Sequence, residues 1–296
     1  MRAGQADNCP GAGRRGDALG CERRVVSASA DDWAVREHYE RPSAVEAVLV
    51  EIASNDCQID PALDHFHVGG AAATQRLAEK AGLAPGARVL DVGSGLGGPA
   101  RQLADAQGWD VTGIDLTPGF CRVAQALSRR NGLGGSTRFC AADAMRLPFA
   151  DDAFDGVWTE HVAMNISARD ALYAELLRIV RPGGRLALFD VVAGENNAAP
   201  LDYPVPWSRD STNSHLVTAD CLKQVLTDAG WGVCVWDDET EFARDWLESA
   251  KAPRGGGRPS LRSLIGNEFP KMVGNLRANF SDGRLGAIQA VLESTA

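Results

Sequence analysis

The segment RVLDVGSGLGG at residues 88–98 constrains the fold of this chain more than any other feature. Its apolar residues form the pattern of a buried strand, which runs into four glycines and then into Pro99 and the helix-like sequence ARQLADA. A strand that turns through glycines into a helix N-terminus lets a ligand lie directly against the backbone, because no Cβ atom stands in the way. The sequence therefore predicts an α/β fold with a ligand site at this turn.

The charge beside the turn indicates what kind of ligand it binds. Gly93, Gly95 and Gly98 satisfy the dinucleotide-binding pattern G-x-G-x-x-G, so an NAD-dependent protein is one interpretation. Asp91 argues against it, because a carboxylate two residues before the first glycine repels a pyrophosphate and attracts a cation. S-adenosyl-L-methionine carries a sulfonium and an ammonium and no phosphate, so it fits this site better.

Two further predicted strands also end in acidic residues. The stretch 109–115 ends in Asp115, 24 residues after Asp91, where a carboxylate can accept both ribose hydroxyls. The stretch 136–143 ends in Asp143, which can accept the exocyclic amine of adenine. Three carboxylates at successive strand ends, one for each polar region of one nucleoside, are more specific than the glycines alone. The predicted cofactor-binding residues are Asp91, Gly93, Ser94, Gly95, Asp115, Leu116, Asp143, Ala144 and His161.

The order of these motifs resembles the class I S-adenosylmethionine-dependent methyltransferases over roughly residues 60–235. The segments that carry the resemblance are LDVGSGLG, GID, AADA, LPF, FDGVW and RPGGRLAL. Within that superfamily, FHVGG, WTEHVAMNI and YPVPW are most similar to small-molecule enzymes of the sarcosine/dimethylglycine N-methyltransferase kind. The resemblance implies a doubly wound, Rossmann-like sheet of seven mostly parallel strands with an antiparallel last strand. It also implies N-terminal lid helices and a cap insertion after the fifth strand.

The composition changes along the chain in a way that suggests one domain behind a tail. Residues 1–30 hold five glycines and five arginines with almost no large apolar residues, so we expect a disordered tail. The remaining residues, 31–296, are predicted to form a single methyltransferase domain. Its expected parts are lid helices and a pocket segment (31–72), a cofactor-binding core (73–193), the cap (194–217) and the last strands and helices (218–296).

The overall composition favours a soluble enzyme. The net charge of −9 gives no electrostatic footprint for nucleic acid or an anionic membrane. No stretch approaches 18 apolar residues, so no membrane span is expected. The seven cysteines form no C-x-x-C pair and no metal-ligand spacing, which indicates free thiols in a reducing cytoplasm. We expect a cytoplasmic monomer or homodimer whose partner is a small-molecule acceptor.

Two residues are candidates for the chemistry of methyl transfer. That reaction is an in-line displacement in which the protein must bring a nucleophile to ~3 Å from the methyl group and exclude water. A general base is needed only if the nucleophile arrives protonated. His161 follows the predicted strand FDGVWTE and is the leading candidate for this base. Tyr39 is the second, because related enzymes often place an N-terminal helix over the cofactor, where Tyr39 could close the site and bind His161.

Other residues are candidates for the acceptor pocket. His65 and His67 alternate on an extended segment; no third ligand has suitable spacing for a metal, so we interpret them as a pocket wall and predict no metal. In the insertion, an aromatic face could receive a cationic amine and an arginine could bind a carboxylate. The alternative is that these aromatics only anchor the cap. The predicted substrate residues are His65, His67, Met164, Asn165, Tyr203, Trp207 and Arg209.

Three functions remain open from the sequence. The first is methylation of a small acceptor, with an amino-acid-like amine favoured by the narrower resemblance. The second is methylation of a carbon or oxygen of a natural product such as an isoprenoid or polyketide. The third is a protein that binds the cofactor without transferring methyl, as a cyclase or a binding module.

Overall fold

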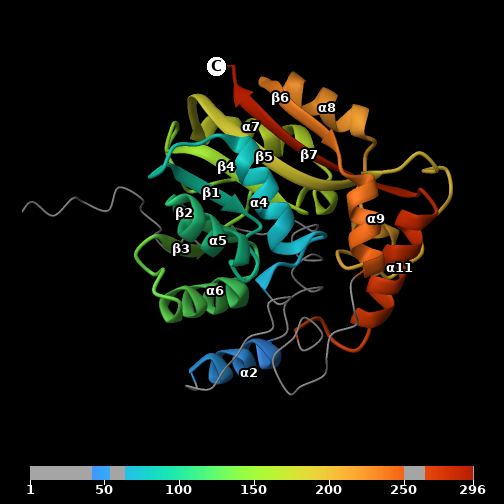
Figure 1. The fold of residues 1–296 in the computed structure, drawn as a ribbon, viewed down its shortest axis with the longest axis horizontal. Helices are drawn as coiled ribbons and strands as arrows, with labels where there is room; N and C mark the ends of the chain where they lie inside the picture. The colour runs from blue at the N-terminus through green and yellow to red at the C-terminus, as the bar shows by residue number, and fades with distance from the viewer. Residues whose placement is uncertain (1–41, 54–63, 250–263, 296) are drawn as a thin grey trace, which may run out of the picture.

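The computed structural model describes residues 42–53, 64–249 and 264–295, and its centre is a seven-stranded sheet (Figure 1). The strand order is β3-β2-β1-β4-β5-β7-β6. The strands are β1 (Arg88–Val92), β2 (Asp110–Asp115), β3 (Thr137–Ala141), β4 (Phe154–Glu160), β5 (Val180–Ala193), β6 (Trp231–Asp238) and β7 (Leu285–Ser294). The reversal of strand order beside β1 places the carboxyl ends of β1 and β4 at the point where ligands bind in doubly wound sheets.

The first five strands are parallel, and β7 runs antiparallel between β5 and β6. This arrangement confirms the predicted mostly parallel sheet with an antiparallel last strand. The sequence of β7 is apolar almost throughout, so it fits a strand buried on both faces as well as a helix. Pairing on both edges shows that the segment is a strand, since β7 joins β5 through Leu188↔Ala290 and β6 through Trp236↔Ala290.

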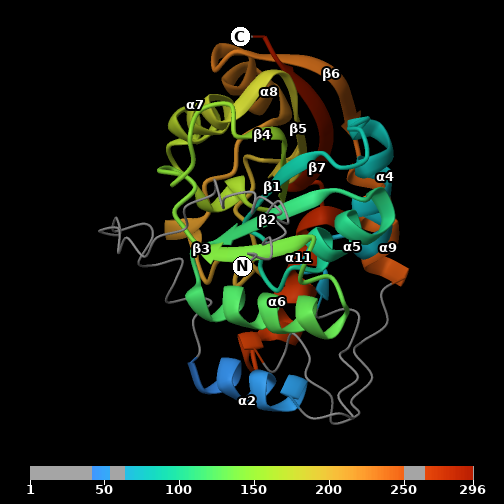
Figure 2. The same cartoon turned by 90° about the vertical axis from the view of Figure 1, so that its left-hand side faces the viewer.

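Helices cover both faces of the sheet, as Figures 1 and 2 show. One face packs against α4, α5, α9 and α11, and the other against α7 and α8, with α6 beside β2 and β3. The helices are α4 (Gly70–Ala81), α5 (Gly98–Gln107), α6 (Pro118–Arg130), α7 (Arg169–Ile179), α8 (Ala219–Asp228), α9 (Thr240–Ser249) and α11 (Phe269–Ser281). No helix among the described residues is long and apolar enough to cross a membrane.

An outer helix, α2 (Pro42–Ala53), packs against α6 at the edge of the molecule (Figure 2). Its buried residues Val45 and Val48 join a cluster with Leu96 and Phe120, two side chains that also line the cavity described below. This helix therefore supports one wall of the site from outside. The expected helix over 31–40 and the tail over 1–30 lie outside the described residues.

The segment 194–217, predicted as the cap, is tied down on α11. Asn279 of α11 is fully buried; its side chain accepts a hydrogen bond from the Asp202 backbone N–H and donates to the Asp202 carbonyl, at 2.9 and 3.0 Å. Asn275 donates to the Pro204 carbonyl at 2.9 Å. A short 3-10 turn, η2 (Ser211–Asn213), follows. The segment is thus anchored by buried amide side chains rather than by regular pairing.

Element boundaries differ from the sequence-based expectation at a few ends. The sequence RPGGRLALFDVV predicts a strand over 185–192, whereas β5 begins at Val180, because Val180 pairs with Phe154 before a register shift in the β4–β5 ladder. The local patterns predict helices over 73–82 and 266–280, whereas α4 begins at Gly70 and α11 at Phe269. These ends depend on pairing and packing partners that local sequence does not contain.

Candidate cofactor and acceptor site

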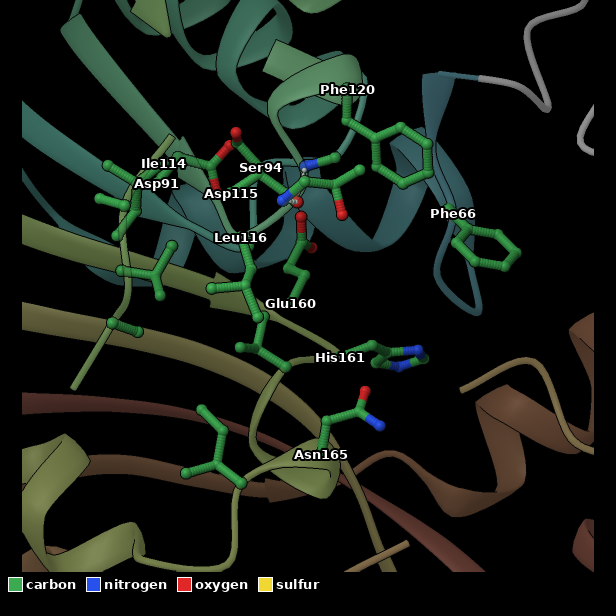
Figure 3. Close-up of a pocket in the computed structure, with 18 of the residues that line it drawn as sticks. Phe66, Asp91, Ser94, Ile114, Asp115, Leu116, Phe120, Glu160, His161 and Asn165 are labelled. Atoms are coloured by element: carbon green, nitrogen blue, oxygen red, sulfur yellow. Dashed lines mark hydrogen bonds between the residues drawn. The ribbon is translucent and has the colours of Figure 1, made fainter. Parts of the chain in front are cut away.

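A cavity of about 430 Å³ opens at the carboxyl ends of β1, β2 and β4 (Figure 3). It lies at the reversal of strand order, where the fold is expected to bind its ligand. Every residue predicted from the sequence to bind the cofactor lines it. These residues are Asp91, Gly93, Ser94, Gly95, Asp115, Leu116, Asp143, Ala144 and His161.

The turn after β1 presents backbone directly to the cavity. Gly95 has φ +52°, and a Cβ atom built there would meet no atom within 4 Å, so the residue faces open space. Its N–H donates to Asp115 Oδ2 at 2.9 Å, and the Thr117 N–H donates to Asp115 Oδ1 at 2.8 Å. These bonds fix the orientation of the Asp115 carboxylate and leave further lone pairs for a ligand. That geometry suits a carboxylate that accepts hydrogen bonds from two ribose hydroxyls.

Asp91 is a buried carboxylate without a compensating charge. It is 2% exposed, and its Oδ2 has no hydrogen-bond partner among the described residues. Burial, Glu160 and Asp115 together raise its pKa well above the ordinary value. An unpaired buried carboxylate is costly unless a ligand supplies the partner, so this atom is suited to a cationic group of the cofactor.

Asp143 lies two residues beyond the end of β3, at the adenine side of the predicted site. Its Oδ1 accepts the Met145 N–H at 2.8 Å, which fixes the side chain at the cavity wall. The residues present therefore fit S-adenosylmethionine: a bare glycine turn, an oriented carboxylate for the ribose, another beside the base, and an unpaired carboxylate for positive charge.

His161 stands at the other side of the same cavity (Figure 3). Its backbone has φ +56°, and its N–H donates to the Phe189 carbonyl at 2.7 Å, so the chain turns sharply at the end of β4. The ring lies 4.9 Å from the Phe189 ring, and its buried Nε2 has no partner among the described residues. Burial and the neighbouring His67 hold its pKa well below 6.5. The imidazole is therefore neutral at physiological pH and able to accept a proton.

Glu160 is a lining residue that the sequence interpretation missed. It is the last residue of β4, directly before His161, and only 9% exposed. Burial raises its pKa to about 7, although hydrogen bonds from Trp158 and Thr74 act in the opposite direction. A carboxylate at the end of a buried strand is the same signal that identified Asp91 and Asp115, and it was present here too.

The rest of the lining is largely apolar. Phe66, Leu96, Phe120, Val162 and Ile166 contribute side chains to it. Within the described part of the chain, the lining contains neither arginine nor lysine. The same part holds no group of three or more His, Cys, Asp or Glu side chains arranged to bind a metal.

Of the residues predicted to contact the acceptor, His67 and Asn165 line the cavity. The Asn165 side chain donates to the Trp207 and Asn213 carbonyls at 2.9 and 3.2 Å, so it joins the β4 loop to the cap. His65 lies behind the lining, with its ring centroid 5.5 Å from that of His67. Met164 is packed in the hydrophobic core, and its carbonyl accepts the His215 N–H.

The predicted cap residues lie away from this cavity. Trp207 is 3% exposed in the main core, and its indole donates to Ser214 at 3.0 Å. Tyr203 packs against the same core, and Arg209 is exposed. The packing of Trp207 and Tyr203 on the core favours the alternative in which these aromatic side chains anchor the cap. The second catalytic candidate, Tyr39, lies outside the described residues.

Fold and site together define a class of protein: a doubly wound α/β protein with a largely apolar cavity, lined by carboxylates, at the switch point of its sheet. Comparison with known families agrees, since a family model described as a methyltransferase domain matches residues 90–188. The part of the chain at residues 90–188 matches the methyltransferase domain family, and these findings support a class I S-adenosylmethionine-dependent methyltransferase.

Individual relatives narrow the function of this chain only in part. The methyltransferase GfsG of Streptomyces halstedii is 40% identical over 134 residues, which cover 45% of this chain and 48% of that protein. The 27-O-demethylrifamycin SV methyltransferase of Amycolatopsis mediterranei is 29% identical over 218 residues, or 73% of this chain and 80% of that protein. The chain spans only about half the length of GfsG and similar or smaller shares of several other curated relatives.

A solved structure covers more of the chain. The [4+2]-cyclase SpnF superposes with a TM-score of 0.63 at 26% identity, covering 88% of this chain and 94% of that one. A protein named as a cyclase therefore shares this fold with proteins named as methyltransferases. Family membership alone does not decide which reaction is catalysed.

Proposed function

We propose that this protein transfers the methyl group of S-adenosylmethionine to a hydroxyl oxygen or a carbon of a small, largely apolar natural product. The observation that carries the proposal is the neutral imidazole of His161, which opens onto the same cavity as the cofactor-binding carboxylates. The similarity to the 27-O-demethylrifamycin SV methyltransferase, whose name specifies an oxygen acceptor, supports it.

When bound, the cofactor supplies an electrophilic methyl group on a positively charged sulfur. Asp91, Asp115 and Asp143 hold the cofactor along the carboxyl edge of the sheet. His161 receives the proton of an acceptor hydroxyl or of an acidic C–H through its Nε2, which has no partner in the described part of the chain. The apolar walls, with Phe66 and Phe120 among them, exclude water from the reacting groups.

The lining favours an acceptor without a phosphate or carboxylate. Such anions are usually bound by arginine or lysine, and none is present in the described lining. The amine hypothesis had two grounds, the narrower resemblance and the side chains of Tyr203, Trp207 and Arg209, and these three residues do not line the cavity. For these reasons we rank an apolar hydroxyl or carbon acceptor above an amino-acid-like amine, which stays the alternative acceptor.

A second function keeps the cofactor site without methyl transfer. The similarity to the cyclase SpnF over 94% of that chain favours it, because an enclosed apolar cavity can also fold a flexible substrate for ring closure. In that case cofactor binding would support the structure of the cavity, and S-adenosylhomocysteine would not be formed.

Incubation with methyl-labelled S-adenosylmethionine tests these functions directly. The acceptor panel should pair neutral hydroxylated macrolactones and phenols with glycine, sarcosine and dimethylglycine. We expect label in a neutral acceptor together with an equal amount of S-adenosylhomocysteine. Label only in an amine would replace the proposed acceptor class. Tight cofactor binding with no label in any acceptor, and ring closure of a polyene without cofactor turnover, would favour the cyclase.

A further inference from the structure

We infer that Glu160 and Asp91 together bind the α-ammonium group of the amino-acid part of the cofactor, with Glu160 as a cofactor-binding residue. The inference rests on the proposed cofactor but not on methyl transfer. It concerns how the site recognises one end of that cofactor, and it gives a role to the lining carboxylate that the catalytic proposal does not use.

The two carboxylates come together through adjacent parallel strands. β1 pairs with β4, and Asp91 lies opposite Trp158, two residues before Glu160 on the same face of β4. Both side chains are buried and both line the cavity. In Figure 3 the Glu160 carboxylate points toward the loop that carries Ser94, whereas the His161 ring points in another direction. Glu160 thus serves the cofactor end of the cavity.

The neighbours of Glu160 orient its carboxylate but do not neutralise it. The Thr74 hydroxyl of α4 lies 3.1 and 3.0 Å from the two oxygens. His67 Nε2 lies 3.5 Å from Oε2. His67 Nδ1 is 3.1 Å from the Val68 carbonyl, which can only accept, so Nδ1 carries the proton.

That assignment leaves Nε2 of a neutral His67 as an acceptor. Burial lowers the pKa of His67 to about 4, so the ring is neutral at physiological pH. A neutral ring with its proton on Nδ1 gives Glu160 neither a positive charge nor a hydrogen-bond donor. Among the described residues, His67 is the basic side chain in contact with Glu160. A cationic ligand can therefore supply the charge that stabilises the ionised form of this buried pair.

The α-ammonium matches the two carboxylates in chemistry. It carries a full positive charge and three N–H donors, so it can bond to Asp91 Oδ2, which is unpartnered in the described structure, and to Glu160 at once. The sulfonium has charge but no donor, and the ribose hydroxyls have donors but no charge and are served by Asp115. The ammonium is the one group of the cofactor that satisfies both demands.

Binding of this cation also changes the protonation of the pair. Without ligand, mutual repulsion and burial favour the protonated carboxyls, and the pKa of Glu160 is about 7. The groups that face Glu160 are Thr74 of α4, His67, Trp158 of its own strand and Asp91 of β1. A bound ammonium stabilises the ionised form, so binding releases protons and becomes stronger as the pH rises through about 7.

A pair of ligands separates this role from a general effect on the site. S-adenosylhomocysteine carries the ammonium, and 5′-methylthioadenosine has the same nucleoside and thioether without the amino-acid part. We expect Glu160→Gln to weaken S-adenosylhomocysteine about 10-fold or more by calorimetry, the size typical of a charged hydrogen bond. Binding of 5′-methylthioadenosine should change less than about 2-fold, since the neutral amide keeps the volume and the Thr74 contact.

Glu79→Gln is the matched control, because it removes the same charge from the exposed face of α4 and should leave both affinities unchanged. Equal weakening of both ligands by Glu160→Gln, or no weakening of S-adenosylhomocysteine, would overturn the inference. If wild-type protein binds neither ligand, both the inference and the proposed function fail. If it binds both but never transfers methyl, the proposed function alone fails.

The wild-type protein provides a second test that does not depend on the folding of a variant. The preference for S-adenosylhomocysteine over 5′-methylthioadenosine should increase several-fold between pH 6 and pH 8, because Glu160 ionises around pH 7 while the ammonium stays charged. A preference that does not change with pH would contradict the role of Glu160.

Discussion

His161 combines an unusual backbone conformation with a ring nitrogen that has no hydrogen-bond partner among the described residues. A non-glycine residue at φ +56° is uncommon and is retained here by its N–H bond to Phe189 and by packing of its ring. The strained turn directs the imidazole into the cavity at the point where β4 ends. These features give the residue the geometry of a general base, which its sequence position only suggested.

Replacement of His161 by asparagine should remove the base with little effect on the turn, since asparagine tolerates positive φ. For a hydroxyl acceptor, we expect kcat to fall by roughly 10²- to 10⁴-fold, the usual contribution of a general base. Single-turnover kinetics at saturating cofactor measures it. Arg209→Ala, an exposed change away from the cavity, should leave kcat unchanged.

The pH profile provides a check on the same residue. The pKa of His161 is held well below 6.5, so kcat at saturating cofactor should stay level from pH 8 down to pH 6.5. A decrease in kcat centred near pH 6.5, or an His161→Asn enzyme within threefold of wild type, would show that another group accepts the proton.

At the scale of elements, the turn after β1 couples two parts of the site. Gly93 has φ +70°, and a Cβ atom built there would lie 2.6 Å from Val162 Cγ2 in the loop after β4. The Val162 N–H in turn donates to Asp190 of β5 at 2.9 Å. The turn after β1 and the loop that follows His161 are therefore packed against each other.

Gly93→Ala should destabilise the protein more than a comparable glycine substitution elsewhere. Gly86 also has positive φ, but a Cβ atom there meets nothing within 4 Å, so Gly86→Ala carries only the backbone cost of about 1–2 kcal/mol. The contact with Val162 should add roughly 1–3 kcal/mol to Gly93→Ala. Urea denaturation of both variants measures the difference, and equal losses would mean that the Val162 loop adapts freely.

The position of the cap could be predicted from the sequence, whereas the role of its aromatic residues could not. Its Asn- and Pro-rich sequence without a period predicts an irregular segment after the fifth strand, as observed. Its aromatic residues are as consistent with a binding surface as with an anchor for the cap. Trp207 is instead buried by the core that α11 helps to form, because burial of a large indole stabilises an otherwise irregular segment.

At the scale of the whole molecule, stability and ligand binding both depend on buried charge. Carboxyls with raised pKa retain protons in the folded state that the unfolded chain has already lost. Histidines with lowered pKa have the opposite effect below pH 6.5, where the unfolded chain takes up protons that the native rings refuse. To measure the effect of one carboxyl on the free energy of unfolding, the wild type must be compared with a variant that keeps the same histidines.

Asp190→Asn supplies that comparison. Burial raises the pKa of Asp190 to about 7, so its ionisation destabilises the native state as the pH rises from about 5 to 8. The free energy of unfolding of wild type should therefore fall relative to the variant by roughly 1–3 kcal/mol over this range. The Val162 N–H can still bond to the amide oxygen. Urea denaturation at several pH values measures the difference, and a constant difference would mean that Asp190 is ionised throughout.

Much of the cofactor half of the site could be predicted from the chain alone. Alternation of strands and helices, the glycine turn and the acid at each strand end are local patterns, and parallel strands necessarily bring their carboxyl ends to one edge. That is why Asp91, Asp115 and Asp143 could be assigned from the sequence and now line one cavity. Glu160 is also an acidic residue at the end of a strand, but the interpretation of the sequence assigned a role to the neighbouring His161 instead.

The acceptor half depended on tertiary structure. Whether Trp207 lines a pocket or fills a core, and which of His65 and His67 reaches the cavity, is decided by which neighbours compete for each side chain. The sequence by itself determined the sheet, its ligand edge and the chemistry of the cofactor. Only the packed molecule decided the protonation of the buried groups and the walls of the acceptor space, because burial and electrostatic environment arise from residues far apart in the chain.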